Sequence, residues 1–124
     1  MRVVCALILE EGRVLACRRP FNKDEAGKWE FPGGKVESGE LDEEALAREI
    51  LEELEMRVLV GRRLCSAEHD GLELIGYVCE RVREEWKLRE HLEARWVDHE
   101  QGDVLDWAVL DVPLWEVVRA RVSA

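Results

Sequence analysis

The sequence predicts a small α/β or α+β domain in which helices cover a mixed sheet. Short apolar segments rich in branched residues alternate with turn residues, as strands do. One long amphipathic segment and a shorter segment near the carboxyl end have the pattern of helices. The chain has 124 residues, 47% of them hydrophobic, which suits one modest core. We therefore expect residues 1–124 to form a single domain.

The expected elements follow one another with short connections. The expected strands are residues 3–9, 13–17, 29–31, 57–67, 72–82 and 94–97. A turn ending at Gly12 makes the first two strands a hairpin, and Pro32, Gly33 and Gly34 are expected to form a tight turn. The expected helices are residues 41–54, which have acidic residues in the first turn, and 114–122, which follow Pro113.

Charge and cysteine content restrict the classes of function. A formal net charge of −10 argues against a general nucleic-acid binder, although a metal among carboxylates can still attract an anionic small molecule. The cysteines are widely spaced, which favours small buried residues in a reducing cytosol over a zinc site or a disulfide framework. No segment approaches the roughly 18 apolar residues of a membrane span, so we expect a cytoplasmic protein without a membrane partner.

Acidic residues gather on one face of the predicted helix 41–54. Glu49, Glu52 and Glu53 are spaced i, i+3 and i+4, which places them within an arc of roughly 100°. The apolar residues of the helix occupy a different arc and can be buried. Such an acidic face is either simply solvated, as is common in an acidic chain, or binds divalent cations. Mg²⁺ prefers one or two carboxylates together with waters and phosphate oxygens.

Residues beside this face favour the second alternative. Gly33 and Gly34 allow the main chain to approach a ligand closely, and a carbonyl there can join a metal shell. Arg48 neighbours Glu49 and can either steer its carboxylate or contact phosphate through its fork of donors.

Residues 34–56 resemble the Nudix box, G-x₅-E-x₇-R-E-U-x-E-E-x-G-U, in which U is a bulky apolar residue. The matching positions are Gly34, Glu40, Arg48, Glu49, Ile50, Glu52, Glu53 and Met56. Glu55 departs from the pattern because it stands where the family has glycine. A glycine there commonly ends the helix in a left-handed conformation, which costs glutamate on the order of 1 kcal/mol. Either the helix ends differently or the protein tolerates this strain.

The resemblance extends beyond the box. The segments LACRRP, GKWEFPGGKVESGE, EH followed by RWV, and LDVPLWEVV are similar to the MutT and CTP-pyrophosphohydrolase branch of the family. The fold that this resemblance implies is the Nudix α/β/α sandwich, a mixed sheet between helices, with the box as loop, helix and loop. The implied cofactor is Mg²⁺, for which Mn²⁺ can substitute.

The resemblance also implies roles for individual residues. Glu52 and Glu53 would be metal ligands, with the carbonyl of Gly33. Glu49 would complete the metal shell or orient the attacking water, and Arg48 would hold Glu49.

Glu40 in the box and the glutamates beyond it have weaker assignments. Glu40 would support the loop or an outer metal. A further glutamate beyond the box would be a metal ligand or base, and Glu90 is favoured over Glu93 because it stands in the EH pair. The alternative for Glu90 is a solvated loop glutamate.

Candidates for binding the nucleotide lie outside the helix. Arg19 and Lys35 would contact the phosphates, although both can be ordinary surface residues. Trp29 and Phe31 point to the same side of a strand and either wall a base pocket or belong to the core. Asp111 either reads the base, as the resemblance implies, or satisfies free N–H groups at the start of the last helix.

The implied activity is hydrolysis of a nucleoside triphosphate to the monophosphate and pyrophosphate. The base would be that of 8-oxo-dGTP or of a CTP or dCTP type of nucleotide. Two alternatives are a Nudix hydrolase of another nucleoside diphosphate derivative, such as ADP-ribose, and a non-catalytic Nudix-fold module that recognises nucleotides. The intact R-E-x-x-E-E pattern disfavours the module. The expected partner is therefore a small nucleotide substrate, and we expect no stable nucleic-acid partner. Both a monomer and a homodimer remain open.

Overall fold

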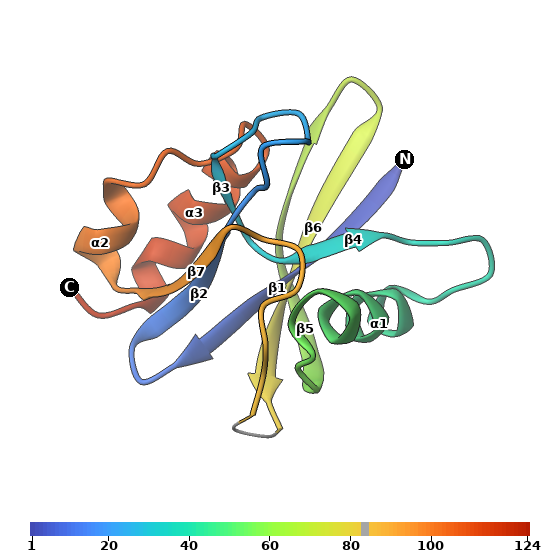
Figure 1. Cartoon of the computed structure of the whole chain (residues 1–124), viewed down its shortest axis with the longest axis horizontal. Coiled ribbons are helices and arrows are strands. Elements are labelled where there is room, and N and C mark those ends of the chain that lie inside the picture. The colour runs from blue at the N-terminus through green and yellow to red at the C-terminus, as the bar shows by residue number, and fades with distance from the viewer. Residues whose placement is uncertain (83–84) are drawn as a thin grey trace.

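The computed structural model of the chain describes residues 1–82 and 85–124. Its strands are β1 (Arg2–Glu10), β2 (Arg13–Arg18), β3 (Trp29–Glu30), β4 (Gly33–Lys35), β5 (Val58–His69), β6 (Leu72–Arg81) and β7 (Glu93–Val97) (Figure 1). Its helices are α1 (Asp42–Leu54), α2 (His99–Asp103) and α3 (Asp111–Val118), and a short 3₁₀ helix (Arg119–Arg121) follows α3.

The strands form a mixed sheet in the order β3-β2-β1-β6-β5. β1 pairs with β6 in parallel, and the other pairings are antiparallel. Both β4 and β2 pair with β1, β4 beside residues 3–5 and β2 beside residues 9–10. β1 therefore joins the two halves of the sheet, and it carries Pro32-Gly33-Gly34 against its amino-terminal half.

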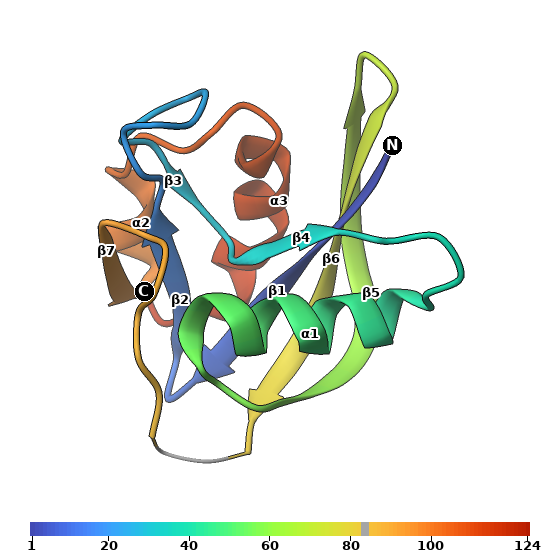
Figure 2. The same cartoon turned by 45° about the vertical axis from the view of Figure 1, so that its right-hand side comes forward.

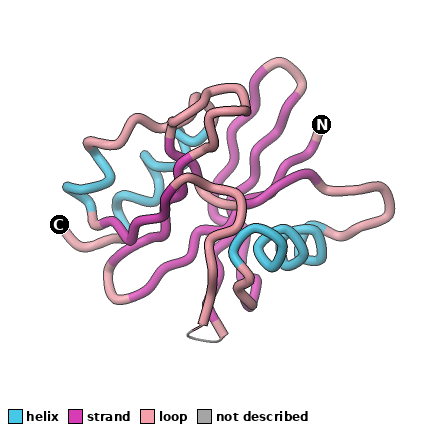
Figure 3. The backbone as a smooth tube through the Cα atoms, viewed as in Figure 1, coloured by secondary structure: helices cyan, strands magenta, loops and turns pink. Residues whose placement is uncertain are grey.

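A hydrophobic core lies on each face of the sheet. Val4, Ala6 and Ile8 of β1 contribute to the core under α1. Cys5 and Leu7 contribute to the core under α3. Figures 1 and 2 show α1 and α3 on opposite sides of β1, and Figure 3 shows helices on both flanks of the strands. Because β1 is buried on both faces, its sequence is a continuous apolar run. The expected α/β/α sandwich is confirmed.

Three local features differ from the prediction or were missed. Gly33 and Gly34 lie in the extended strand β4 rather than in a tight turn, and neither has a positive φ. Helix α2 was not predicted; its signal is Asp98, whose side chain accepts a hydrogen bond from Gln101 N at 2.9 Å. Helix α3 begins at Asp111 rather than at residue 114, so Pro113 lies in its first turn, where proline is tolerated.

The end of α1 decides between the two alternatives for Glu55. Glu55 has φ 49° and ψ 35°, which is the left-handed conformation, and its N–H donates to Leu51 O. The helix therefore ends as the family's glycine would end it, and the protein tolerates a strain of about 1 kcal/mol.

The cysteines are free, and Cys5, Cys17 and Cys79 are buried, as expected of small apolar residues. In the described part of the chain, no helix combines the length and the apolar character needed to cross a membrane.

Candidate active site

Helix α1 presents its three glutamates unequally. Its apolar face, with Leu46 and Ile50, is fully buried against the sheet. Glu53 is only 7% exposed, whereas the side chain of Glu52 is 55% exposed. Glu49 lies between these extremes. The structure therefore turns Glu49 and Glu53 inward and leaves Glu52 near the solvent.

Glu49 and Glu53 face a cavity of about 630 Å³. It is bounded by the amino-terminal half of β1, by β4, by the loop after β2 and by the turn before α3. Its lining includes Arg19, Glu30, Phe31, Gly33, Gly34, Lys35, Glu49, Glu53, Glu90 and Asp111. Most of the residues proposed from the sequence meet in this cavity. Glu52, Arg48 and Trp29 do not line it.

Arg48 lies behind Glu49 and holds it. Its Nη1 donates to Glu49 Oε1 at 2.8 Å. Its Nε and Nη2 donate to the two oxygens of Glu40 at 2.8 and 2.9 Å, and Nη2 also donates to Lys35 O at 3.1 Å. The hydrogen bonds from Arg48 lower the pKa of Glu40 to about 2. The contact predicted between Arg48 and Glu49 is present, and Glu40 braces Arg48 while its Oε1 accepts from Glu37 N at 2.9 Å.

The two glycines are required by close approach rather than by their backbone angles. A Cβ at Gly33 would collide with the backbone of Val4 on β1. A Cβ at Gly34 would collide with the carboxylate of Glu49. Gly33 N also donates to Glu53 Oε1 at 3.2 Å. The pair therefore brings bare main chain against both inward-facing glutamates.

Glu53 is an unusual carboxyl group. Burial, together with the smaller effect of the neighbouring charges of Glu30, Glu49 and Glu90, raises the pKa of Glu53 to about 8. Burial also raises the pKa of Glu49, against the influence of Arg48. Ionised carboxylates gathered in this way repel one another, and a bound cation would offset this repulsion.

The donor set suits a hard divalent cation. Within residues 1–82 and 85–124, no three acidic, histidine or cysteine side chains converge closely enough to hold a metal ion by themselves. Magnesium does not need three, because it keeps several waters and takes one or two carboxylates with substrate oxygens. Glu49, Glu53 and Glu90 line the cavity. Glu93 instead lies on β7, where Arg95 Nε donates to it at 2.8 Å.

A network of charged side chains in the wall of the cavity was not predicted. Glu30 Oε1 accepts from Arg19 Nη1 at 2.6 Å, and Glu30 Oε2 lies 2.8 Å from His91 Nε2. Arg19 also donates to the backbone and side chain of Asp24. Arg19 therefore reaches the cavity wall with much of its charge already compensated. The available signal was a charged residue, Glu30, between the buried Trp29 and Phe31.

Another part of the cavity is lined by Phe31 and Asp111. Phe31 is also a core residue, because it is 3% exposed and its ring centroid lies 4.8 Å from that of Trp107. Trp29 is also buried, but it packs under Arg95, whose guanidinium carbon lies 4.9 Å from the ring centroid. For Trp29 the structure therefore favours the core alternative.

Asp111 does not satisfy its own helix. It is 6% exposed, and its Oδ1 accepts from Phe31 N at 2.9 Å. The N-cap of α3 is Leu110, and no side chain caps this end. The helix-capping interpretation of Asp111 is therefore wrong. Burial raises the pKa of Asp111 well above its usual range, and its other oxygen has no hydrogen-bond partner among the described residues.

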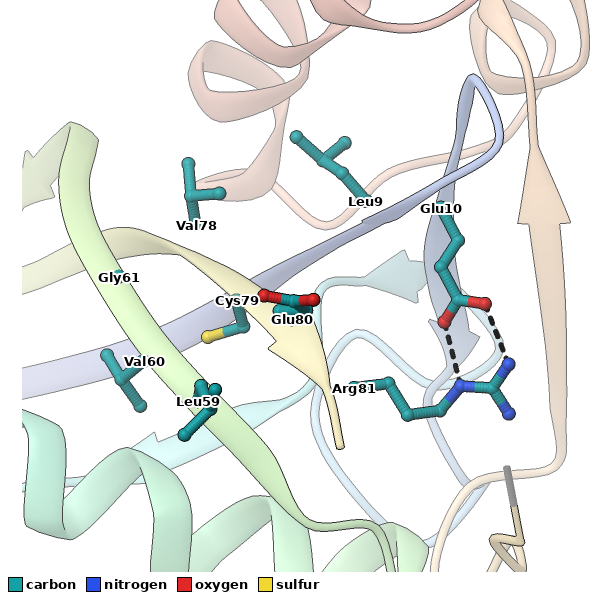
Figure 4. A pocket seen from close by; sticks show the side chains of 9 residues that line it. All are labelled: Leu9, Glu10, Leu59, Val60, Gly61, Val78, Cys79, Glu80 and Arg81. Carbon is teal, nitrogen blue, oxygen red and sulfur yellow. Dashed lines mark hydrogen bonds and ion pairs between the residues drawn. The ribbon is translucent and has the colours of Figure 1, made fainter. Parts of the chain in front are cut away.

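A second cavity, of about 590 Å³, lies away from these residues between β1, β5 and β6 (Figure 4). Its notable polar contact is between Arg81 and Glu10, whose atoms approach to 2.7 Å. It contains no group of inward-facing carboxylates and no glycine pair beside a helix. The chemistry proposed from the sequence therefore belongs to the first cavity.

Comparisons with known proteins agree with this geometry. The NUDIX domain family model matches residues 1–114. The chain is 33% identical to the CTP pyrophosphohydrolase of Escherichia coli over all of this chain and 95% of the relative. It is 35% identical to a putative 8-oxo-dGTP diphosphatase of Mycobacterium tuberculosis over 88% of this chain and 81% of the relative. The solution structure of the E. coli ORF135 protein is similar with a TM-score of 0.79 and 34% identity, over 96% of this chain and 88% of that one. The chain therefore belongs to the Nudix family and is a hydrolase of phosphoric anhydrides.

Proposed function

We propose that this Nudix hydrolase converts a nucleoside triphosphate to the monophosphate and pyrophosphate with Mg²⁺, acting on 8-oxo-dGTP or on a CTP or dCTP type of nucleotide. One observation carries the proposal. Phe31 N donates to Asp111, and Gly33 N donates to Glu53. Residues two apart in an extended chain are separated by about 7 Å. Asp111 and the carboxylates of α1 therefore lie along one wall, where a single nucleotide can contact both.

The cavity has the size and the chemical division that this substrate needs. Its volume of about 630 Å³ lies within the roughly 300–1,000 Å³ of typical small-molecule sites. The candidate metal ligands are Glu49, Glu52, Glu53 and Glu90, of which one or two would hold the metal with the carbonyl of Gly33, while waters and phosphate oxygens would complete its shell. When bound, a divalent cation neutralises phosphate charge and lowers the pKa of a coordinated water.

The protein's own groups position the reactants. Arg48 occupies Oε1 of Glu49, which leaves Oε2 beside Gly34 to orient the attacking water. Lys35, at the exposed end of β4, would contact the phosphate chain, and Arg19 would contribute its remaining donors. The chemistry then depends mainly on holding water and phosphorus in line.

Asp111 supports a base that offers a hydrogen-bond donor. Its Oδ1 accepts from Phe31 N, and the other oxygen, on a residue that lines the cavity, can accept a hydrogen bond from the base. The edges of cytosine and of 8-oxoguanine both offer an exocyclic amine and a carbonyl, whereas uracil offers no amine. Phe31 would contact the base beside it. The names of the relatives, a CTP pyrophosphohydrolase and a putative 8-oxo-dGTP diphosphatase, point to the same two bases.

The test is turnover of a nucleotide panel with the products identified by anion exchange. The panel contains 8-oxo-dGTP, dGTP, CTP, dCTP, UTP and ADP-ribose, each with and without Mg²⁺. We expect monophosphate and pyrophosphate from 8-oxo-dGTP or from the cytidine nucleotides, and no turnover without the metal. A preference for ADP-ribose, or release of orthophosphate from triphosphates, would contradict the proposal. Tight binding of a nucleotide without turnover would instead favour the recognition module.

A further inference from the structure

The loop that carries Glu90 is fastened to the end of helix α1. Lys87 N donates to Leu54 O at 2.7 Å, and Arg89 N donates to Glu53 O at 2.9 Å. The last carbonyls of a helix lack partners within the helix. Here the loop satisfies two of these carbonyls. The backbone of Arg89, next to Glu90, is thereby bonded to Glu53, whose side chain lines the cavity.

Glu55 adds a side-chain contact to this attachment. Arg89 Nη1 donates to Glu55 Oε2 at 2.9 Å. Glu55 has a left-handed backbone, which glycine adopts without strain and glutamate does not. The residue that departs from the Nudix box therefore keeps an unfavourable conformation, and it supplies a carboxylate that glycine lacks.

The other neighbour of Glu90 is held from the opposite side. His91 Nε2 lies 2.8 Å from Glu30 Oε2, and Leu92 N donates to Arg18 O at 3.0 Å. The side chain of His91 is 2% exposed, and its Nδ1 is buried without a hydrogen-bond partner among the described residues. The Glu30 contact is thus the polar contact that orients this ring.

Glu90 therefore lies between two residues that are each paired with a glutamate from another element. Its own side chain lines the cavity with Glu49 and Glu53. We propose that Arg89 and His91, held by Glu55 and Glu30, are positioning residues that keep Glu90 directed at the metal-binding carboxylates. The glutamate at position 55 replaces glycine because it completes this clamp. The inference rests on the proposed function, in which Glu90 is a metal ligand.

The test is a charge-reversal cycle on the exposed pair, read by Mn²⁺ binding. The variants are Glu55→Arg, Arg89→Glu and the double variant, and free Mn²⁺ is measured by electron paramagnetic resonance without nucleotide. We expect each single variant to weaken Mn²⁺ binding about fivefold or more, and the double variant to return within about twofold of wild type. The exposed Arg62→Glu on β5 is the control, because it makes the same charge change as Arg89→Glu away from the loop.

Three further variants separate the clamp from a structural effect and from the role of Glu90. Glu55→Gly removes the carboxylate and the backbone strain together, so we expect weaker Mn²⁺ binding at an equal or higher melting temperature. For His91 we expect weaker binding in His91→Leu and recovery in His91→Gln, which keeps a donor for Glu30. If Glu90→Gln binds Mn²⁺ like wild type, the proposed ligand role of Glu90 fails. If Glu90→Gln weakens binding while the charge reversals do not, the clamp is refuted and the ligand role stands.

Discussion

Replacing Glu53 by glutamine should stabilise the metal-free protein while it lowers kcat strongly. Glu53 is 7% exposed and lies among other carboxylates, and its pKa is about 8 against an ordinary value of 4.5. Glutamine has the same shape and can accept the hydrogen bond from Gly33 N, but it never ionises. Its advantage over glutamate therefore depends on pH.

The sign and size follow from linkage. A carboxyl group with a raised pKa in the folded state stabilises the fold most below its unfolded pKa, here about 4.5. That stability is lost as pH rises toward the folded value of about 8, and little more is lost above it. Between pH 5 and pH 9, the free energy of unfolding of the wild type should fall relative to Glu53→Gln by about 4 kcal/mol.

The assay is urea unfolding of both proteins in a chelator at pH 5, 7 and 9. We expect the difference between variant and wild type to grow steadily with pH and to shrink when Mg²⁺ is added, because the metal favours the ionised form. In parallel, kcat should fall about 100-fold or more, which corresponds to roughly 2.7 kcal/mol. A difference that does not change with pH would refute the argument that Glu53 is held as a strained carboxyl group.

The other predictions concern groups beside this carboxylate and in the aromatic part of the cavity. Gly34→Ala should lower kcat about tenfold or more with little change in melting temperature, because the new methyl group displaces the carboxylate of Glu49. Gly33→Ala, one residue earlier, should instead destabilise the fold by roughly 1–3 kcal/mol, because its methyl group meets the backbone of β1. Asp111→Asn keeps the acceptor for Phe31 N but offers only donors to the base. It should therefore lower the ratio of kcat/KM for CTP to that for UTP about tenfold, whereas an equal loss on all nucleotides would exclude base reading.

The sequence was sufficient where the information is local. Helix α1 and its acidic face lie within one continuous segment, so spacing alone placed Glu49 and Glu53 together. Spacing could not show that Glu52 is largely exposed and lies outside the cavity lining, because that depends on which side of the helix the sheet covers. The glycine pair was recognised, but the structural reason for glycine at these positions was not. That reason is the pairing of β4 with β1, thirty residues earlier in the chain.

The parts that could not be predicted depend on contacts between distant segments. His91 meets Glu30 across a separation of 61 residues, and Asp111 meets Phe31 across 80. The residue types suggested a helix cap for Asp111, because acidic residues commonly satisfy the free N–H groups of their own helix. The structure instead uses this acid to hold the segment between β3 and β4, and no local pattern distinguishes these two uses.

Helix α1 combines two opposing contributions to stability. Its inner face buries Leu46, Ile50 and Leu54 completely, and each such side chain contributes roughly 1.5–3 kcal/mol. On the cavity side, ionising Glu53 costs a free energy comparable to the contribution of one or two of these buried side chains. Burial of the apolar face therefore offsets the cost of a charged Glu53 in the metal-free protein. It follows that Ile50→Val should leave the metal-free protein folded at pH 5. Above pH 8 the same variant should unfold a larger fraction of the metal-free protein, because ionisation of Glu53 has already lowered the free energy of unfolding.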